Sequence, residues 1–272
     1  MLLKDARLIY MDVETTGLSP AMGDRIVEIG MIACQGCREQ VRWSQLINPQ
    51  RDISPSAQAI HRIRPEDVAD CPSFAQVAPK IAELLDGAWL VAHNASFDVG
   101  FVAMELMLAG VQANPAGCLD TCQLATAIWE LPNYKLPTVA RHLAIDTPDL
   151  HRAEIDAEIS SRILARIVSE LGTWATVRPE ELVQLQRYPI RWPPGSDLKL
   201  PEPIYDALTN GQEIRIRYRN GTGKESHRVI QPVGYFGVGQ HLYIRARCNL
   251  AKELRTFRLD RIDIEGSPTI RK

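Results

Sequence analysis

The chain has 272 residues, 45% of them hydrophobic and 24% charged, with a formal net charge of −2. This composition is ordinary for a globular protein, and the absence of any run of eighteen apolar residues excludes a membrane span. The N-terminal sequence lacks the features of a signal peptide, and the six cysteines are scattered as in chains that keep their thiols reduced. We therefore expect a cytoplasmic protein.

The charge is divided unevenly along the chain. From residue 198 onward there are 14 Lys and Arg against 8 Asp and Glu, a balance of +6. The first 197 residues hold 17 basic and 25 acidic residues, a balance of −8. A basic C-terminal part is compatible with a polyanionic partner, and an acidic front part suits a carboxylate site that binds metal.

The first part of the chain opens with three predicted strands, at 6–13, 25–35 and 38–47, and a hairpin turn joins the last two. Strand and helix patterns then alternate. Short strands are predicted at 88–92 and 118–121. Helices are predicted at 74–85, 97–109, 135–143 and 154–170, and another ends at Trp129. This order indicates a mixed α/β layered domain over residues 1–172.

The composition changes after this domain. Residues 173–203 are rich in proline and predict a linker with a short helix at 179–187, and the clearest linker sequence is Pro193-Pro194-Gly195-Ser196. Residues 204–272 form the last predicted domain. Its strands are expected at 214–219, 227–235, 241–247 and 253–259. Short strands packed so closely along the chain suggest a small all-β barrel.

Two carboxylates end the first predicted strand. The run from Ala6 to Val13 is largely apolar, and because a strand alternates faces, Asp12 and Glu14 project to the same side. Two neighbouring carboxylates at the end of an apolar strand repel each other and lose hydration, so the pair favours bound cations. A solvated strand end is the alternative interpretation.

Two further acidic patches lie downstream. Asp98 closes the segment His93-Asn94-Ala95-Ser96-Phe97-Asp98 in the first turn of a predicted helix, where a lone Asp is also an ordinary partner of the helix dipole. His151 and Asp156 are five residues apart, which is roughly 140° around an ideal helix. They converge only if His151 lies in a loop before the helix, and the sequence at 148–149 favours such a loop.

Taken in order, the patterns D-x-E-T-T-G-L, H-N-A-S-F-D and H-R-A-x-x-D resemble the three exonuclease motifs of DnaQ-like 3′→5′ exonucleases of the DEDDh class. The resemblance implies an RNase H-like fold, in which helices flank a mixed five-stranded sheet, and a site for two Mg²⁺ or Mn²⁺ ions. By position it implies four metal ligands, which are Asp12, Glu14, Asp98 and Asp156. It also implies that His151 is the general base. One departure is Arg62, which stands where relatives commonly have glycine.

The implied chemistry is phosphodiester hydrolysis. Two divalent cations activate water and stabilise the leaving 3′ oxygen, and a neutral histidine accepts the proton of that water. We expect Thr15, Thr16 and Gly17 to hold the terminal 3′-hydroxyl and Leu18 to contact the last base, unless Leu18 packs in the core. His93 and Asn94 either contact phosphate or shape their turn.

The C-terminal domain resembles a WYL domain, although only the tyrosine of the naming tripeptide is kept, in Leu242-Tyr243-Ile244. The resemblance implies an Sm-like or SH3-like fold that binds nucleic acid or a nucleotide-type ligand. The expected contact surface combines tyrosines with basic side chains and consists of Tyr218, His227, Tyr243, Arg245, Arg255 and Arg258. An ordinary solvated face is the alternative.

The sequence thus predicts a 3′-to-5′ exonuclease that hydrolyses single-stranded nucleic acid, DNA in preference to RNA, to nucleoside 5′-monophosphates. The WYL-like domain would bind the substrate strand or a regulatory ligand. Related exonucleases are often dimers, which leaves a homodimer open. Two alternative functions also stay open: a ligand-sensing regulator in which the nuclease fold is a scaffold, and a polymerase proofreading subunit.

Overall fold

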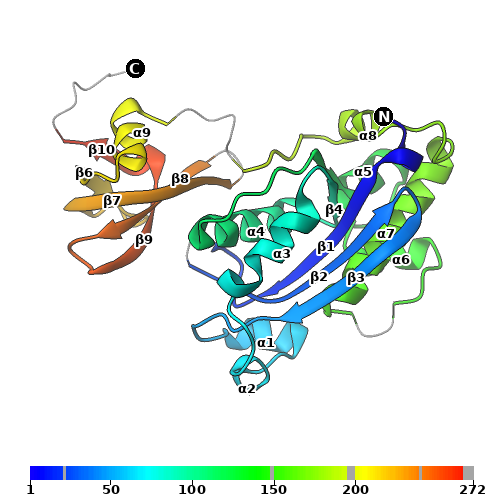
Figure 1. The fold of residues 1–272 in the computed structure, drawn as a ribbon, viewed down its shortest axis with the longest axis horizontal. Coiled ribbons are helices and arrows are strands. Elements are labelled where there is room, and N and C mark those ends of the chain that lie inside the picture. The colour runs from blue at the N-terminus through cyan, green and yellow to red at the C-terminus, as the bar shows by residue number, and fades with distance from the viewer. Residues whose placement is uncertain (21–22, 148–149, 195–199, 239–240, 266–272) are drawn as a thin grey trace. The chain divides into compact units, whose positions relative to one another are not determined.

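The computed structural model describes residues 1–272 except 21–22, 148–149, 195–199, 239–240 and 266–272. The chain divides into two compact units, one made of Met1–Leu18 and Asp24–Trp192 and the other of Ser19–Gly23 and Pro193–Lys272. Figure 1 labels most of the helices and strands of both units. Within the described ranges, no helix is long and apolar enough to cross a membrane.

The first unit is built on a mixed five-stranded sheet with the order β3-β2-β1-β4-β5. Its strands are β1 (Arg7–Thr15), β2 (Ile26–Gln35), β3 (Arg38–Leu46), β4 (Trp89–Ala92) and β5 (Gly117–Asp120). The first three strands pair antiparallel, whereas β4 runs parallel to both β1 and β5. The predicted mixed sheet is therefore confirmed.

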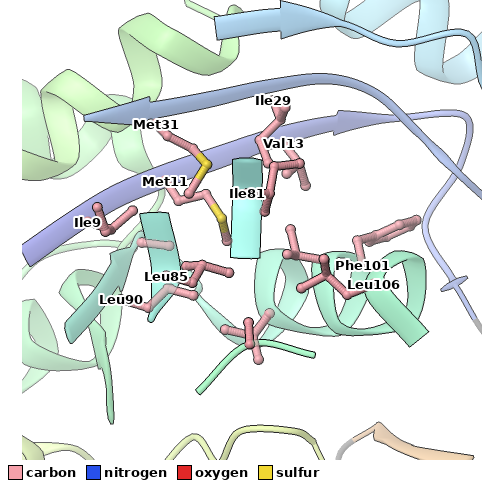
Figure 2. Packing of buried hydrophobic residues seen from close by; sticks show 14 of the residues in the cluster. Ile9, Met11, Val13, Ile29, Met31, Ile81, Leu85, Leu90, Phe101 and Leu106 are labelled. Atoms are coloured by element: carbon pink, nitrogen blue, oxygen red, sulfur yellow. The ribbon is translucent and has the colours of Figure 1, made fainter. Parts of the chain in front are cut away.

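Helices cover both faces of this sheet, which is why its central strands are apolar on both sides. Ile9, Met11 and Val13 of β1 pack with α3 (Phe74–Leu85) and α4 (Ser96–Ala109), as Figure 2 shows. The alternate residues Leu8 and Tyr10 pack with α7 (Ala153–Leu171). The side chains of Asp12 and Glu14 therefore project from the face that α7 covers.

The remaining helices of the first unit are short. The layer with α7 also contains α5 (Thr121–Ile128), α6 (Leu136–His142) and α8 (Pro179–Leu185). The 3-10 turn η1 (Leu3–Asp5) precedes β1, and α1 (Pro55–His61) and α2 (Pro65–Val68) lie between β3 and α3. Helix α1 was not among the predicted helices. Its signal was Ser54-Pro55, because Ser54 caps the helix and Pro55 occupies its first position.

Residues 173–192, which we predicted as part of a linker, pack against the first unit. Leu182 is fully buried, the backbone N–H of Asp120 donates to Oε1 of Gln186 at 2.7 Å, and Nε1 of Trp192 donates to the carbonyl of Ala113 at 2.8 Å. Apolar and amide side chains in this proline-rich stretch account for the packing. The predicted linker sequence at 193–196 falls partly outside the described residues, and the domain boundary at 172 stays a prediction.

The second unit combines helix α9 (Glu202–Thr209) with an antiparallel sheet of order β10-β6-β7-β8-β9. The elements are β6 (Ile214–Arg219), β7 (Glu225–Val238), β8 (His241–Cys248), β9 (Glu253–Arg258), η3 (Leu259–Arg261) and β10 (Ile262–Ile264). The all-β character was predicted and α9 was not. Among the described strands β9 pairs with β8 alone and β10 with β6 alone, so the sheet does not close into the expected barrel.

Candidate active site

A glycine on β2 lets α7 approach the two carboxylates of β1. Asp12 lies opposite Gly30 in the β1–β2 ladder. A Cβ atom at residue 30 would lie 2.3 Å from the backbone nitrogen of Glu154, in the first turn of α7. The missing side chain therefore allows the start of α7, which carries Asp156, to pack closely over this end of the sheet.

His151 lies in the turn before α7 with a left-handed backbone, at φ +70°. Its backbone N–H donates to Oδ2 of Asp156 at 3.3 Å. A ring nitrogen of His151 and carboxylate oxygens of Glu14 and Asp156 all lie within 4.8 Å of one another. His151 in the turn and Asp156 in the helix thus converge, as the sequence analysis required. Pro148 and Asp149, on which the predicted loop was based, lie outside the described residues.

Asp98 reaches the same end of the sheet from α4. Its side chain is 2% exposed, and Oδ1 accepts a hydrogen bond from the backbone N–H of Val13 at 3.0 Å. Val13 lies between the two acids of β1, so the structure brings all five predicted catalytic residues to one place.

The donor set fits a hard divalent cation, because Mg²⁺ and Mn²⁺ prefer carboxylate oxygens and tolerate imidazole. Oδ1 of Asp156 is buried and has no hydrogen-bond partner in the described part of the chain. A bound cation would satisfy this oxygen, which buried polar groups normally require. Asp12, Glu14, Asp98 and Asp156 could hold such ions, with His151 beside them.

Burial and mutual repulsion raise the pKa of all four acids. Loss of hydration, with smaller contributions from neighbouring carboxylates, raises the pKa of Glu14 to about 8 and that of Asp156 to about 6. The pKa values of Asp12 and Asp98 are also raised well above their usual range, mainly by burial. Four ionised carboxylates are therefore unfavourable here near neutral pH unless cations offset their repulsion.

Glu28 on β2 is a further buried acid of this site that was not among the predicted residues. Its carboxylate accepts hydrogen bonds from Nη2 of Arg152 at 2.8 Å and from the backbone N–H of Ala153 at 3.1 Å. It thus anchors the turn that carries His151. Its only trace in the sequence is a single charge inside an otherwise apolar strand, and the structure places it opposite Glu14 in the ladder.

The segment predicted to hold the 3′ end has its hydroxyl groups engaged within the protein. Oγ1 of Thr15 donates to the carbonyl of Gly17 at 2.6 Å, and Oγ1 of Thr16 accepts from the backbone N–H of Arg25 at 3.0 Å. The side chain of Leu18 is 83% exposed. Leu18 is therefore not a core residue, which leaves it available to a ligand.

His93 shapes its turn through both ring nitrogens. Nδ1 lies 2.9 Å from Oγ1 of Thr121, and Nε2 lies 2.7 Å from the carbonyl oxygen of Tyr134. Burial lowers the pKa of His93. Asn94 has a left-handed backbone and an exposed side chain, and its N–H donates to Asp120 at 2.9 Å.

The predicted WYL-like surface is only partly assembled. Tyr243, Arg245 and Arg258 share one face of the β8–β9 ladder, because Tyr243 lies opposite Arg258 and Arg245 is two residues further along β8. The ring of Tyr218 instead packs edge-on against the buried Phe257, with 5.1 Å between the ring centroids.

The other two members of that predicted surface are engaged locally. His227 pairs with Glu265, and Arg255 pairs with Glu253 at 2.7 Å. Arg255 also lies opposite Ala246 in the ladder, on the face away from Tyr243 and Arg258.

A cleft of about 630 Å³ opens beside the acid cluster. Its walls come from β2 and β3, from the connection between α1 and α2, and from the turn into α7. His151 lines the cleft and also belongs to the acid cluster, so the two are continuous. His61 supports one wall, because its ring nitrogens contact the carbonyl of Thr15 at 3.2 Å and the N–H of Ile63 at 3.0 Å.

Comparison with known proteins gives two family matches. Residues 9–164 match the family described as Exonuclease, and residues 200–264 match the WYL domain. The 3′-5′ exonuclease DinG of Bacillus subtilis is 36% identical over 166 residues, which are 61% of this chain and 18% of DinG. DNA polymerase III subunit epsilon of Treponema pallidum is 33% identical over 161 residues, which are 58% of this chain and 74% of that protein.

The match spans less than a fifth of DinG and about 12% of the PolC-type DNA polymerase III of Bacillus cereus. Among solved structures, Exonuclease X in complex with 5′ overhanging duplex DNA is 30% identical, with a TM-score of 0.52, and the match covers 65% of this chain and 98% of that one. A complex of E. coli ExoI with single-stranded DNA has a TM-score of 0.56 at 14% identity, over 89% of this chain and 54% of that one, and shows likeness of fold.

The mixed sheet and its flanking helices are those of the RNase H-like exonucleases, and the motif residues meet at one end of that sheet. The chain therefore belongs to the exonuclease family, and a WYL domain follows its exonuclease domain in the sequence.

Proposed function

We propose that this protein is a divalent-metal-dependent 3′-to-5′ exonuclease that hydrolyses single-stranded nucleic acid, DNA in preference to RNA, to nucleoside 5′-monophosphates. The observation that carries the proposal is the convergence of Glu14, His151 and Asp156, whose ligand atoms lie within 4.8 Å of one another beside Asp12 and Asp98. This constellation has the donors that phosphodiester hydrolysis requires.

The four carboxylates would hold two divalent ions, Mg²⁺ or Mn²⁺. When bound, these ions would supply Lewis acidity toward the attacking water and the leaving oxygen. His151 would accept the proton of that water, since its ring lies on an exposed turn next to Glu14 and Asp156. Glu28 would keep the turn in place by holding Arg152 and the N–H of Ala153.

The loop after β1 would receive the terminal nucleoside. The exposed Leu18 supports a contact with the last base, and the backbone around Thr15, Thr16 and Gly17 would lie beside the 3′-hydroxyl. His93 and Asn94 would act by holding the segment before Asp98 in shape, because the ring of His93 contacts the carbonyl of Tyr134 and the N–H of Asn94 donates to Asp120. DNA is favoured because Exonuclease X, at 30% identity, was solved with DNA.

We also propose that the WYL domain binds the substrate strand or a regulatory nucleotide-type ligand. The balance of +6 beyond residue 198 and the shared face of Tyr243, Arg245 and Arg258 support this role. Deleting residues 198–272 distinguishes the two roles. Loss of salt-sensitive substrate binding would favour contact with the strand, and retained binding with altered regulation would favour sensing.

A second candidate is a polymerase proofreading subunit. The 33% identity to the epsilon subunit of Treponema pallidum over 74% of that protein favours it. The same reaction would then act on ends held by a polymerase. Co-purification with a polymerase catalytic subunit would support this role, and full activity on free oligonucleotides without a partner would favour the independent nuclease.

The test is a gel assay on 3′- and 5′-labelled single-stranded DNA and RNA with Mg²⁺ or Mn²⁺. Wild type should shorten both substrates from the 3′ end, DNA faster, and Asp12→Ala and EDTA should abolish the ladder. Asp70→Ala removes an exposed carboxylate and should leave cleavage unchanged. Absence of metal-dependent cleavage on every substrate would refute the nuclease and support a ligand-sensing regulator.

A further inference from the structure

Arg62 ends helix α1 in a conformation that favours glycine. Its φ and ψ are +61° and +11°, in the left-handed region, and its N–H closes the helix by donating to the carbonyl of Gln58 at 2.8 Å. Glycine is common at this position because a Cβ atom makes the conformation unfavourable. Glycine would end this helix at lower cost, so helix termination alone does not account for an arginine here.

The side chain of Arg62 lines the cleft beside the acid cluster, together with His151. It is exposed, and it makes no hydrogen bond or ion pair with any residue that the structure describes. The two neighbouring arginines differ in this respect. Arg64 binds Asp67 at 3.2 Å, and Arg152 binds Glu28 at 2.8 Å.

The acids of the cleft wall are already paired with other cations. Glu28 is held by Arg152, Asp67 by Arg64, and Glu154 lies 3.5 Å from Arg42. These pairs leave the guanidinium of Arg62 as a positive charge without a counter-ion among the residues that the structure describes, in a concave site next to the acid cluster. A guanidinium in this setting is suited to a phosphate oxygen, which it can bind through two N–H groups.

We infer that Arg62 binds the phosphodiester backbone of the substrate strand on the 5′ side of the bond that is cleaved. This inference rests on the proposed exonuclease function. It places the part of the strand upstream of the cleaved bond in the cleft beside the acid cluster. The acids repel a polyanion, so a fixed cation at the adjoining wall would offset that repulsion where the strand enters. Arg62 is thus a substrate-positioning residue that does not take part in the chemical step.

The test compares two substrates with wild type, Arg62→Gly, Arg62→Lys and Arg166→Ala. A ten-nucleotide DNA strand has phosphates upstream of the cleaved bond, whereas thymidine 5′-p-nitrophenyl phosphate has none. Arg62→Gly should raise KM for the strand about tenfold, the scale of one charge-assisted contact. It should also flatten the plot of log(kcat/KM) against log[salt] by about 0.7, the contribution of one phosphate contact on a single strand.

Hydrolysis of the small ester by Arg62→Gly should equal that of wild type, and its unfolding temperature should be no lower. Arg62→Lys should recover part of the loss, because it keeps the charge but not the planar donor pair. Arg166→Ala removes an exposed arginine of α7 that does not line the cleft, and it should behave as wild type on the strand.

An unchanged KM and salt slope in Arg62→Gly would overturn the inference, as would an equal loss on both substrates or an equal loss in Arg166→Ala. If wild type cleaves neither substrate, the proposed function fails separately. In that case, fluorescence anisotropy of the labelled strand in Ca²⁺ compares strand binding by Arg62→Gly and wild type. Weaker binding by Arg62→Gly would support the inference, and equal binding would overturn it.

Discussion

The carboxylate of Glu28 accepts a hydrogen bond from the guanidinium of Arg152 at 2.8 Å, joining β2 to the turn before α7. Glu28 is 3% exposed and also accepts the N–H of Ala153. One buried side chain therefore fixes both the start of α7 and the residue that follows His151.

Glu28→Gln should lower kcat/KM about 10- to 100-fold, the range seen when a group that orients metal ligands is lost. The amide keeps the shape and still accepts from Ala153, but it loses the charge that holds Arg152. Initial rates on a 3′-labelled strand give the loss, and far-UV circular dichroism checks the fold. Glu154→Gln removes a half-exposed partner of Arg42 and serves as control. Wild-type rates in Glu28→Gln would contradict the anchoring role.

Gly30→Ala should destabilise the protein and impair the site together. Its Cβ would lie 2.3 Å from the backbone N of Glu154, so α7 must move away from the sheet and take Asp156 with it. Overpacking of this kind costs about 1–3 kcal/mol. Urea unfolding measures the cost, and a rate assay at saturating Mg²⁺ measures the loss of activity.

Gly87→Ala is the matched control for that substitution. Gly87 has a left-handed φ of +66° but no atom within 4 Å of a Cβ, so the change strains the backbone without moving α7. It should lower stability and leave kcat unchanged. Equal losses of activity in both variants would show that general destabilisation, rather than displacement of α7, causes the defect.

The sequence was sufficient to predict features that depend on local patterns. Alternating and continuous apolar runs predicted the strands of the first sheet. The resemblance of three short motifs to those of DEDDh exonucleases grouped five residues, which the structure brings together: Asp12, Glu14, Asp98, His151 and Asp156. The site was predictable because each motif sits where an element begins or ends.

Other features depended on contacts between distant residues. The packing of Leu182 and Trp192 on the first unit was missed because prolines dominate the local composition of 173–203. Engagement of the Thr15 and Thr16 hydroxyls within their loop could not be read from residue types alone. Glu28 was missed because a single charge inside an apolar strand gives no spacing pattern, and its meaning emerges only when Arg152 is placed beside it.

The stability of the metal-free protein should fall as the pH rises from 6.5 to 8. The pKa of Glu14 is raised in the folded protein to about 8, from 4.5 in the unfolded chain. In this window the folded state therefore binds more protons than the unfolded state, and ionisation of Glu14 destabilises it. Buried histidines whose pKa is lowered, such as His61, act in the opposite direction, because the unfolded chain still binds their proton near pH 6.5. This opposing contribution fades above that pH, whereas the contribution of Glu14 continues to about pH 8.

Thermal unfolding in EDTA at several pH values measures this dependence. Glu14→Gln should flatten it, and Mg²⁺ should raise the unfolding temperature of wild type more at pH 8 than at pH 6.5. Glu66→Gln changes an exposed carboxylate and should leave the dependence as in wild type. A wild-type stability that rises with pH in EDTA would contradict a raised pKa of Glu14 in the folded protein.

His151→Ala should lower kcat about 10²- to 10⁴-fold, as expected when a general base is removed. A base differs from a metal ligand in its effect on ion binding. If the carboxylates alone hold the ions, the increase in unfolding temperature caused by Mg²⁺ should be the same in His151→Ala and wild type. A lost increase would instead make the ring a ligand, which its place within 4.8 Å of Glu14 and Asp156 also permits.

A chain ending at residue 192 should be more stable than one ending at 172. The longer chain keeps the buried Leu182 and the hydrogen bond from Asp120 to Gln186, which lie beside the segment that positions Asp98. Removing them exposes the apolar surface that Leu182 covers and leaves the Asp120 N–H without its partner, and each loss destabilises the fold. Urea unfolding of both truncated chains measures the difference. Equal midpoints would place the domain boundary at 172 and make the 173–192 segment a linker in energetic terms.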